Sequence, residues 1–121
     1  MAILGKEIPK ELSEEVYNFL ESVRRSGGKI KKGVNETTKA IERGFAKLVV
    51  VAENVEPKEI VMHLPLLAKE KNIPIIAVDS KEELGKAAGI EVAASSVAVI
   101  DLGKAKKEYE ALIKKIEEIM K

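Results

Sequence analysis

The sequence predicts an α/β fold, a three-layer α-β-α sandwich in which helices cover both faces of a sheet of about four strands. First, stretches with apolar residues three or four positions apart alternate at short intervals with short apolar runs rich in β-branched residues. Second, 121 residues suffice for one domain with its own core, and there is no cysteine that a disulfide would need. Third, no repeat or low-complexity segment divides the chain, so residues 1–121 are expected to form a single domain.

The first helix is expected to begin at Pro9, because proline is favoured at the first position of a helix. Ser26, Gly27 and Gly28 should end it, and residues 29–31 can then form a short strand. Apolar residues recur along one side of this helix, at Leu12, Val16, Phe19, Leu20 and Val23.

A second helix is predicted after a basic loop. Asn35 is a preferred cap residue, and Gly33 before it can adopt a positive φ or lie close to a ligand. The side turned toward the core carries Val34, Thr38, Ile41 and Phe45. The opposite, polar side carries Asn35, Glu36, Lys39 and Arg43. Free N–H groups at such a helix start attract phosphate.

Three further strands are expected at residues 47–52, 73–78 and 96–100. The first of these, KLVVVA, is apolar almost throughout, which is typical of a central strand covered on both faces. Pro74 is tolerated near the start of the second.

Three helices should connect and follow these strands. One should begin at Pro57 and turn Ile60, Leu64, Leu67 and Ala68 inward, although Pro65 should kink or split it. Ser80 and Glu83 form a capping box for a short helix that ends at Gly89. The C-terminal segment has helical spacing at Tyr109, Leu112, Ile113, Ile116, Ile119 and Met120.

Positive charge is concentrated in one segment. Residues 24–47 hold eight basic and two acidic residues, a net charge of +6, whereas the whole chain carries only +1 and the remainder therefore about −5. A basic face on an otherwise acidic protein favours a polyanionic partner, because neutralising phosphates releases counterions.

Glu36 suggests that bases are read as well as phosphates. Phosphates would repel a carboxylate, whereas base amino groups can donate hydrogen bonds to it while Asn35 and Lys39 contact guanine edges. An ordinary first helical turn explains the same residues, with Asn35 as cap, Glu36 favoured by the helix dipole and Lys39 solvated. Spacing alone leaves both interpretations open.

No motif indicates an enzyme, a cofactor or a metal site. The phosphate-binding patterns GxGxxG and GxxxxGK[ST] are absent, and His63, the one histidine, has no cysteine to join it in a zinc site. The apolar runs are too short for a bilayer, so we expect no membrane association and a cytoplasmic location. The few aromatic residues are predicted to belong to the core, which favours a folded RNA over a stacked single strand: Tyr17, Phe19, Phe45 and Tyr109.

Residues 30–100 closely resemble the archaeal large-subunit ribosomal protein family L-seven-Ae, whose members bind kink-turn RNA. The resemblance is carried by the motifs GVNETTKAIERG, AKLVVVAENVEPKEIVMHLPLLAKEKNIP and DSKEELGKAAGIEVAASSVAVI. It implies the same sandwich with a mixed sheet, and recognition without catalysis, in which the protein selects a kinked conformer that free RNA populates only in part.

The resemblance also implies roles for individual residues. Four match the family's contacts to tandem sheared G·A pairs: Gly33, Asn35, Glu36 and Lys39. Lys32 matches a backbone contact, and Arg43 continues the same polar face.

Two further groups of residues follow from the same resemblance. Glu56, Ile60 and Lys81 match a pocket for a flipped-out nucleotide; taken alone, Glu56 is a helix cap and Lys81 a surface lysine. The family's second RNA-facing loop corresponds to Ile90, Glu91 and Val92. Ala93 stands where many relatives have proline, so this loop should be less rigid.

The partners implied by the resemblance are ribosomal RNA, box C/D and box H/ACA guide RNAs and ribonuclease P RNA, with a Nop-domain scaffold protein and fibrillarin. The corresponding processes are ribosome biogenesis, guide ribonucleoprotein assembly and tRNA processing, and the free protein is expected to be a monomer. Two alternatives are a non-catalytic module that docks an acidic protein through the basic face, and a small RNA-modifying enzyme that uses Glu36 or His63.

Overall fold

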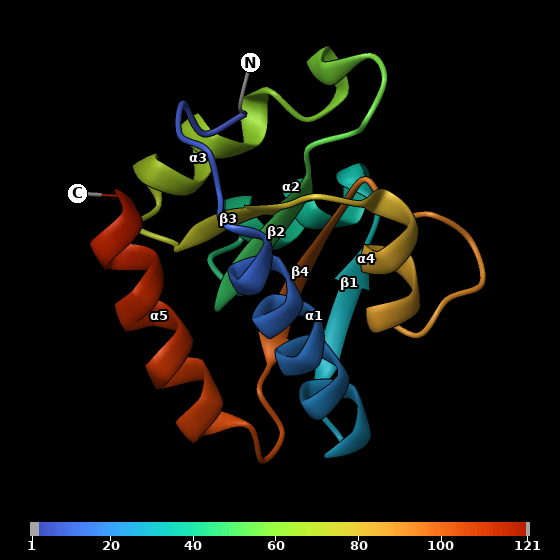
Figure 1. Cartoon of the computed structure of the whole chain (residues 1–121), viewed down its shortest axis with the longest axis vertical. Helices are drawn as coiled ribbons and strands as arrows, with labels where there is room; N and C mark the ends of the chain where they lie inside the picture. Colours follow the sequence, from blue (N-terminus) through green and yellow to red (C-terminus); the bar gives the residue numbers. More distant parts are fainter. Residues whose placement is uncertain (1–2, 121) are drawn as a thin grey trace.

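The computed structural model describes residues 3–120, which form a four-stranded mixed sheet with helices on both faces (Figure 1). The strand order is β1-β4-β2-β3. β4 runs antiparallel to both β1 and β2, and β2 runs parallel to β3. The strands are β1 (Lys29–Lys32), β2 (Leu48–Ala52), β3 (Ile75–Val78) and β4 (Ser96–Asp101).

Helices α1 and α4 lie on one face of the sheet, α2 and α3 lie on the other, and α5 lies beside α1 (Figure 1). This arrangement confirms the predicted three-layer sandwich. The helices are α1 (Lys10–Arg25), α2 (Val34–Glu42), α3 (His63–Glu70), α4 (Lys81–Ala87) and α5 (Lys106–Met120). A single 3₁₀ turn, η1 (Lys58–Ile60), precedes α3.

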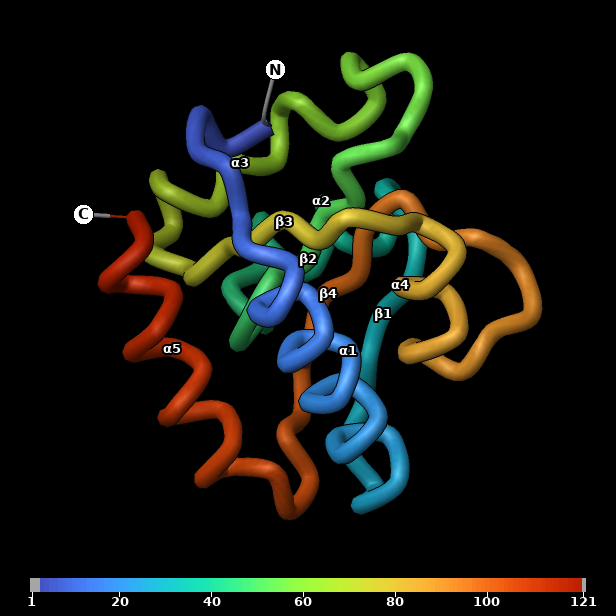
Figure 2. Tube along the Cα trace, in the orientation of Figure 1, coloured from blue at the N-terminus to red at the C-terminus, as the bar shows by residue number. Residues whose placement is uncertain are grey.

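The core lies between the sheet and both helical layers. Every residue of β2 is buried, as expected for an interior strand with helices on both sides. On α1 the buried apolar residues are the predicted stripe: Leu12, Val16, Phe19, Leu20 and Val23. In Figure 2 the first described residues run past α3, and the end of α5 lies near them. No helix within residues 3–120 is long and apolar enough to cross a membrane.

The prediction that a helix begins at Pro57 is wrong. Only η1 forms there, and α3 begins at His63. Pro65 therefore lies in the first turn of α3, where its missing N–H would have had no partner within the helix. Leu64 and Ala68 are buried as predicted, but Ile60 is exposed.

The second helix differs from the prediction in its cap and its inward face. Gly33, with φ 93°, is the N-cap residue of α2, so Asn35 is not the cap. Thr37 and Ala40 are buried beside Ile41. Phe45 is 61% exposed, because α2 ends at Glu42 and the chain leaves the helical path at Gly44, with φ 73°. Thus Phe45 is not a core residue.

The start of α4 forms one half of the predicted capping box, because the Ser80 N–H donates to the Tyr17 hydroxyl at 3.1 Å and not to the Glu83 side chain. The backbone N–H of Glu83 donates to Ser80 Oγ at 3.1 Å, and Gly89, with φ 87°, follows the end of this helix. In α5, Leu112 and Ile116 are buried, as the periodicity predicted.

Candidate nucleic-acid interface

Four connecting segments meet at one end of the sheet, at the upper right of Figure 1. Because β4 is antiparallel to both of its neighbours, its first residues lie beside the last residues of β1 and β2. Because β3 is parallel to β2, its last residues lie at the same end. The segments that meet there are residues 32–36, 53–60, 79–82 and 89–95, and they contain all the predicted site residues except Lys39 and Arg43, which lie further along α2.

Hydrogen bonds to β4 hold the start of α2 in place. The Gly33 N–H donates to the carbonyl of Ser96 at 2.9 Å, and the Gly33 carbonyl accepts from the Thr37 N–H at 2.9 Å. Behind this turn, the buried hydroxyl of Ser96 donates to the buried Thr37 Oγ1 at 3.2 Å. Within residues 3–120 no side chain caps the first turn of α2, so its terminal N–H groups are able to donate to an anion.

The polar face of α2 projects into solvent next to this turn. It consists of Asn35, Glu36, Lys39 and Arg43, all of them exposed. Within residues 3–120 these four side chains form neither hydrogen bonds nor ion pairs with the rest of the chain. Their donors and acceptors are therefore available to a ligand, and a carboxylate between an amide and two cations can accept hydrogen bonds that the cations cannot.

The segment after β2 is tied to the start of α4 through Asn54. Its Oδ1 accepts from the Lys81 N–H at 2.8 Å, and its Nδ2 donates to Glu82 Oε1 at 3.2 Å. Hydrogen bonds from the backbone N–H of Glu82 itself and from Asn54 lower the pKa of the Glu82 carboxyl. Asn54 thus fixes the position of Lys81 relative to the exposed residues Glu56 and Ile60.

The loop before β4 rests on α4. Its Ala94 N–H donates to the Lys81 carbonyl at 2.9 Å, and its Ile90 N–H to the Gly85 carbonyl at 3.0 Å. Ile90 is half-buried against the core, so it supports the loop from below. Glu91 is exposed and Val92 is 69% exposed, which leaves these two side chains to face a ligand.

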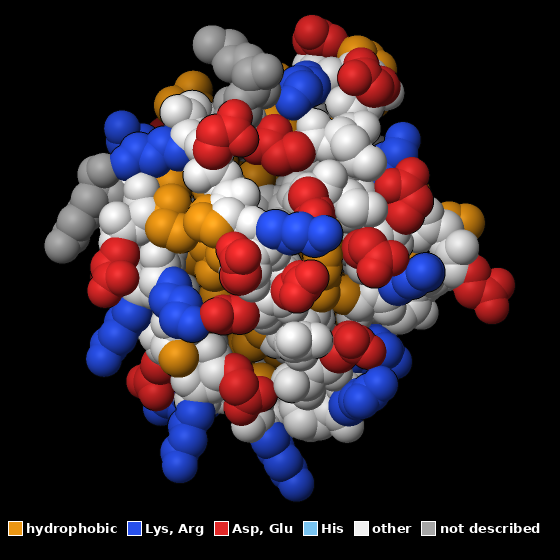
Figure 3. Space-filling model, viewed as in Figure 1, with side chains coloured by type: hydrophobic (Ala, Val, Ile, Leu, Met, Phe, Trp, Pro, Cys, Tyr) orange, Lys and Arg blue, Asp and Glu red, His pale blue; other side chains and the backbone are white. Residues whose placement is uncertain are grey.

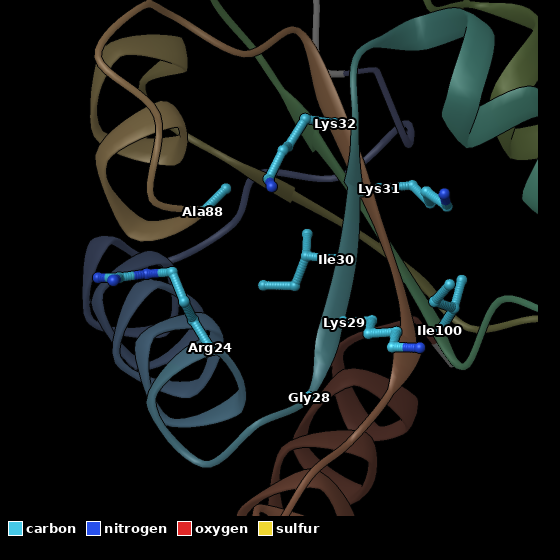
Figure 4. A pocket seen from close by; sticks show the side chains of 8 residues that line it. All are labelled: Arg24, Gly28, Lys29, Ile30, Lys31, Lys32, Ala88 and Ile100. Atoms are coloured by element: carbon cyan, nitrogen blue, oxygen red, sulfur yellow. The ribbon is translucent and has the colours of Figure 1, made fainter.

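The predicted site residues do not all lie on one side of the sheet. Figure 4 shows Lys32 and Ile30 pointing from β1 toward α1 and α4, whereas Lys31 points to the other side, where α2 lies. Lys32 lines a cavity of about 310 Å³ together with Arg24 of α1. A ligand that contacts both Lys32 and the polar face of α2 must therefore pass around the end of β1.

Three residues near this interface were not predicted to belong to it. Asn54 had no local signal, because its partners are 27 and 28 positions away. Lys31 could have been assigned to the α2 side from the alternation of side chains along a strand. Phe45 lines a groove beside α2 together with Glu36.

His63 takes part in one structural contact. Its Nε2 lies 2.9 Å from Thr38 Oγ1, a hydrogen bond that joins α3 to α2. Within residues 3–120, no group of three or more histidine, aspartate, glutamate or cysteine residues is arranged to hold a metal ion.

The face over α1 has a different character from the polar face of α2. Figure 3 shows acidic side chains gathered across the centre of this face, over α1 and the neighbouring loops. This distribution agrees with the negative charge that the sequence leaves outside residues 24–47.

The chain is similar to known proteins both in sequence and in structure. The sequence model of the ribosomal protein L7Ae/L30e/S12e/Gadd45 family matches residues 14–109. The structure of the Giardia lamblia 15.5kD RNA binding protein superimposes with a TM-score of 0.89 and 30% sequence identity, over 97% of this chain and 97% of that one.

Proposed function

The chain belongs to the ribosomal protein L7Ae/L30e/S12e/Gadd45 family, and from this premise we propose that it is an RNA-binding protein that recognises and stabilises kink-turn motifs. Binding is the whole of its activity, and it catalyses no reaction. The similar Giardia lamblia structure, which is that of an RNA binding protein, supports RNA binding in general.

One observation supports the recognition of kink-turn RNA in particular. Residues chosen from the sequence in three separate groups meet at one end of the sheet, although up to about sixty positions separate them along the chain. The β1–α2 junction presents N–H groups without a side-chain cap, and α2 presents an amide, a carboxylate and two cations that have no partner within residues 3–120. This combination suits base edges with phosphates beside them, as in the opened groove of a kinked internal loop.

Each group of residues has a part in the mechanism. The edges of the sheared G·A pairs form hydrogen bonds with α2, in which Glu36 accepts, Lys39 donates and Asn35 does both. Lys32 contacts the RNA backbone. The flipped-out nucleotide lies against Ile60, with Lys81 as the nearby cation, and Val92 covers the bases of the bulge. Because these contacts exist only when the RNA is bent, binding shifts its population toward the kinked conformer.

The cellular role belongs to the same proposal. The protein acts in the large ribosomal subunit and as a core component of box C/D and box H/ACA guide complexes, with a Nop-domain scaffold and fibrillarin as neighbours. Ribonuclease P RNA is a further target, and the location is cytoplasmic.

Calorimetric titration against two RNAs tests the proposal. One RNA contains a kink-turn, and in the other Watson–Crick pairs replace its G·A pairs. We expect the first to bind at least a hundredfold more tightly, a difference of about 2.7 kcal/mol. Equal and strongly salt-dependent affinities would reduce the interface to a nonspecific basic face, and binding of acidic peptides without regard to RNA structure would favour a protein-docking module.

Matched variants on α2 test the base contacts. Glu36→Ala should cost about 1–3 kcal/mol with the kinked RNA and little with the Watson–Crick RNA, since only base contacts distinguish the two. Glu42→Ala removes another exposed carboxylate, at the other end of α2, and serves as the control. If both variants change binding equally on both RNAs, Glu36 does not read bases.

A further inference from the structure

Phe45 is a large aromatic side chain that the fold leaves in solvent. It is 61% exposed, just beyond the C-terminus of α2. In a helix that ends in a glycine turn, the residue after the glycine commonly packs on the residue five positions before it, here Phe45 on Ala40. Alanine offers only a methyl group, so this contact leaves most of the ring uncovered.

The backbone around Phe45 is fixed. The Phe45 N–H donates to the Ala40 carbonyl at 2.9 Å, and the Gly44 N–H donates to the Ile41 carbonyl at 3.0 Å. Two residues later, the Lys47 N–H donates to the Val99 carbonyl at 2.7 Å, and the Lys47 carbonyl accepts from the Tyr109 hydroxyl at 2.8 Å. The ring therefore projects from an anchored turn, which lowers the entropy that a ligand would have to remove.

The ring lines a groove of about 200 Å³ between α2 and the edge of the sheet, which we call the α2 groove. Its apolar surface comes from Phe45, Ala40 and Ile100. A β-bulge shifts the pairing of β1 and β4 between Lys29 and Ile30, and Ile100 is the residue left without a partner there. In Figure 4, Ile100 and Lys31 both point to the α2 side of β1.

The rim of the α2 groove is charged. Lys31, Lys39 and Arg43 supply three cations, and Glu36 supplies one carboxylate. None of these side chains forms an ion pair or a hydrogen bond within residues 3–120. Glu36 and Lys39 also belong to the proposed base-reading face, so the groove continues directly from it along α2.

The α2 groove is complementary to a ligand with a flat apolar part and negative charge at its edge. A bare phosphate would leave the exposed ring unexplained, and an apolar peptide would leave the three cations unpaired. A nucleotide supplies both parts, because its base can stack on an aromatic ring while its phosphate meets the cations. Bases inside a duplex are covered by their neighbours, so the base that stacks must be unpaired.

We propose that the α2 groove binds an unpaired nucleotide that flanks the kinked motif, with its base stacked on Phe45 and its phosphate held by Lys31 and Arg43. This inference rests on the proposed function, because it assumes that the same RNA already lies along Glu36 and Lys39. It adds a second nucleotide site, on the opposite side of β1 from the direction in which Lys32 points (Figure 4).

The test uses the full chain and a set of kink-turn RNAs. Each RNA carries one unpaired uridine, moved position by position along both strands of the stems that flank the G·A pairs, and a fully paired RNA is the reference. The measured quantity is the gain, the ratio of the dissociation constant of the reference RNA to that of the RNA with the uridine. For the wild-type protein we expect a gain of about fivefold to a hundredfold at one position, the range found for one stacked base.

Variants assign the gain to Phe45. Phe45→Ala should reduce it to about one, and Phe45→Trp should preserve it, because tryptophan also stacks. Leu66→Ala is the control, since Leu66 on α3 is 64% exposed and does not line the α2 groove. Photo-crosslinking of 4-thiouridine at the position of gain should label residues 40–45.

The outcomes separate this inference from the proposed function. If kinked RNA is preferred over its Watson–Crick counterpart but no uridine position gives a gain that Phe45→Ala removes, the second nucleotide site does not exist and kink-turn recognition stands. If the preference for kinked RNA is absent, the proposed function fails. A gain that depends on Phe45 would then still support a nucleotide site in the α2 groove.

Discussion

The missing side chain of Gly85 makes room for the loop that precedes β4. A Cβ added there would lie 2.0 Å from the carbonyl oxygen of Val92, far inside van der Waals contact. The same residue accepts the Ile90 N–H, so both backbone neighbours of Glu91 are held against α4 at this one position. The position of the exposed Glu91 and Val92 side chains thus depends on the absence of a side chain at Gly85.

Gly85→Ala tests this dependence. We expect it to lower the free energy of unfolding by about 1–3 kcal/mol, because either the loop or α4 must move to admit the methyl group. Urea unfolding measures the effect. Lys86→Ala, at the exposed neighbouring position, should change stability by no more than about 0.5 kcal/mol. A Gly85→Ala protein as stable as the wild type would contradict the close contact.

The hydrogen bond from Asn54 to Glu82 affects the pKa of the Glu82 carboxyl, which can be measured directly. The pKa of Glu82 is lowered from its ordinary 4.5, first by its own backbone N–H and then by the Asn54 amide. The lowered pKa means that the charged form is the stabilising one. Its contribution is complete above pH 4.5 and is lost as the pH falls through the lower pKa of the folded protein.

In an NMR titration, Glu82 should therefore ionise at lower pH than glutamates without such bonds. Asn54→Ala should raise its midpoint toward 4.5 without restoring it fully, because the backbone hydrogen bond remains. An unchanged midpoint in the variant would show that Asn54 does not bond to the carboxylate in solution.

At the scale of elements, the junction of β1 and α2 determines where the side chains proposed to read bases point. Gly33 has φ 93° and ψ 157°, a region that residues with a side chain hardly enter. This turn lets the chain leave the edge strand and start a helix at once, while the Gly33 N–H remains bonded to Ser96. The direction of α2 therefore depends on this single backbone conformation.

Gly33→Ala should destabilise the protein by about 1–3 kcal/mol through backbone strain. Crowding adds nothing, because no atom lies within 4 Å of the position that a Cβ would take. Kinked RNA should bind more weakly as well, since α2 would shift. Gly5→Ala places a side chain at another positive φ, 75°, in the N-terminal segment, and should leave RNA affinity unchanged. Equal affinities for wild type and Gly33→Ala would refute a role for this turn in recognition.

At the scale of the whole molecule, positive charge is concentrated in residues 24–47, which border the proposed interface. Acidic side chains gather across the centre of the face over α1, with lysines and arginines among and around them (Figure 3). An uneven distribution of charge favours one orientation toward a polyanion before specific contacts form and makes affinity depend on salt.

The salt dependence separates backbone contacts from base contacts. In a plot of log K against log salt concentration, Lys32→Ala should reduce the slope by about one and weaken kinked and unkinked RNA alike. Asn35→Ala should leave the slope unchanged and weaken kinked RNA alone. Lys69→Ala removes an exposed lysine of α3 and should have neither effect. Equal slopes for Lys32→Ala and the wild type would exclude Lys32 from the phosphate contacts.

Local patterns predicted much of the fold. The α1 stripe, the buried β2 and the cap of α4 are properties of neighbouring residues, and each was confirmed. Two errors arose where a pattern was extended past its element. Phe45 continues the spacing of α2 but lies beyond its end, and Ile60 continues that of α3 before its start.

By itself the sequence determined which groups are available for recognition: an amide, a carboxylate and cations at helical spacing after a glycine, in a basic segment. Those choices are local, since side-chain chemistry and helical period act over a few residues. Only the tertiary structure decided that residues 32–36, 53–60, 79–82 and 89–95 share one surface, that Lys32 points away from α2, and that Phe45 is exposed. These features depend on the strand order β1-β4-β2-β3 and on bonds such as that from Gly33 to Ser96, which pair residues distant in the chain and leave no local signal.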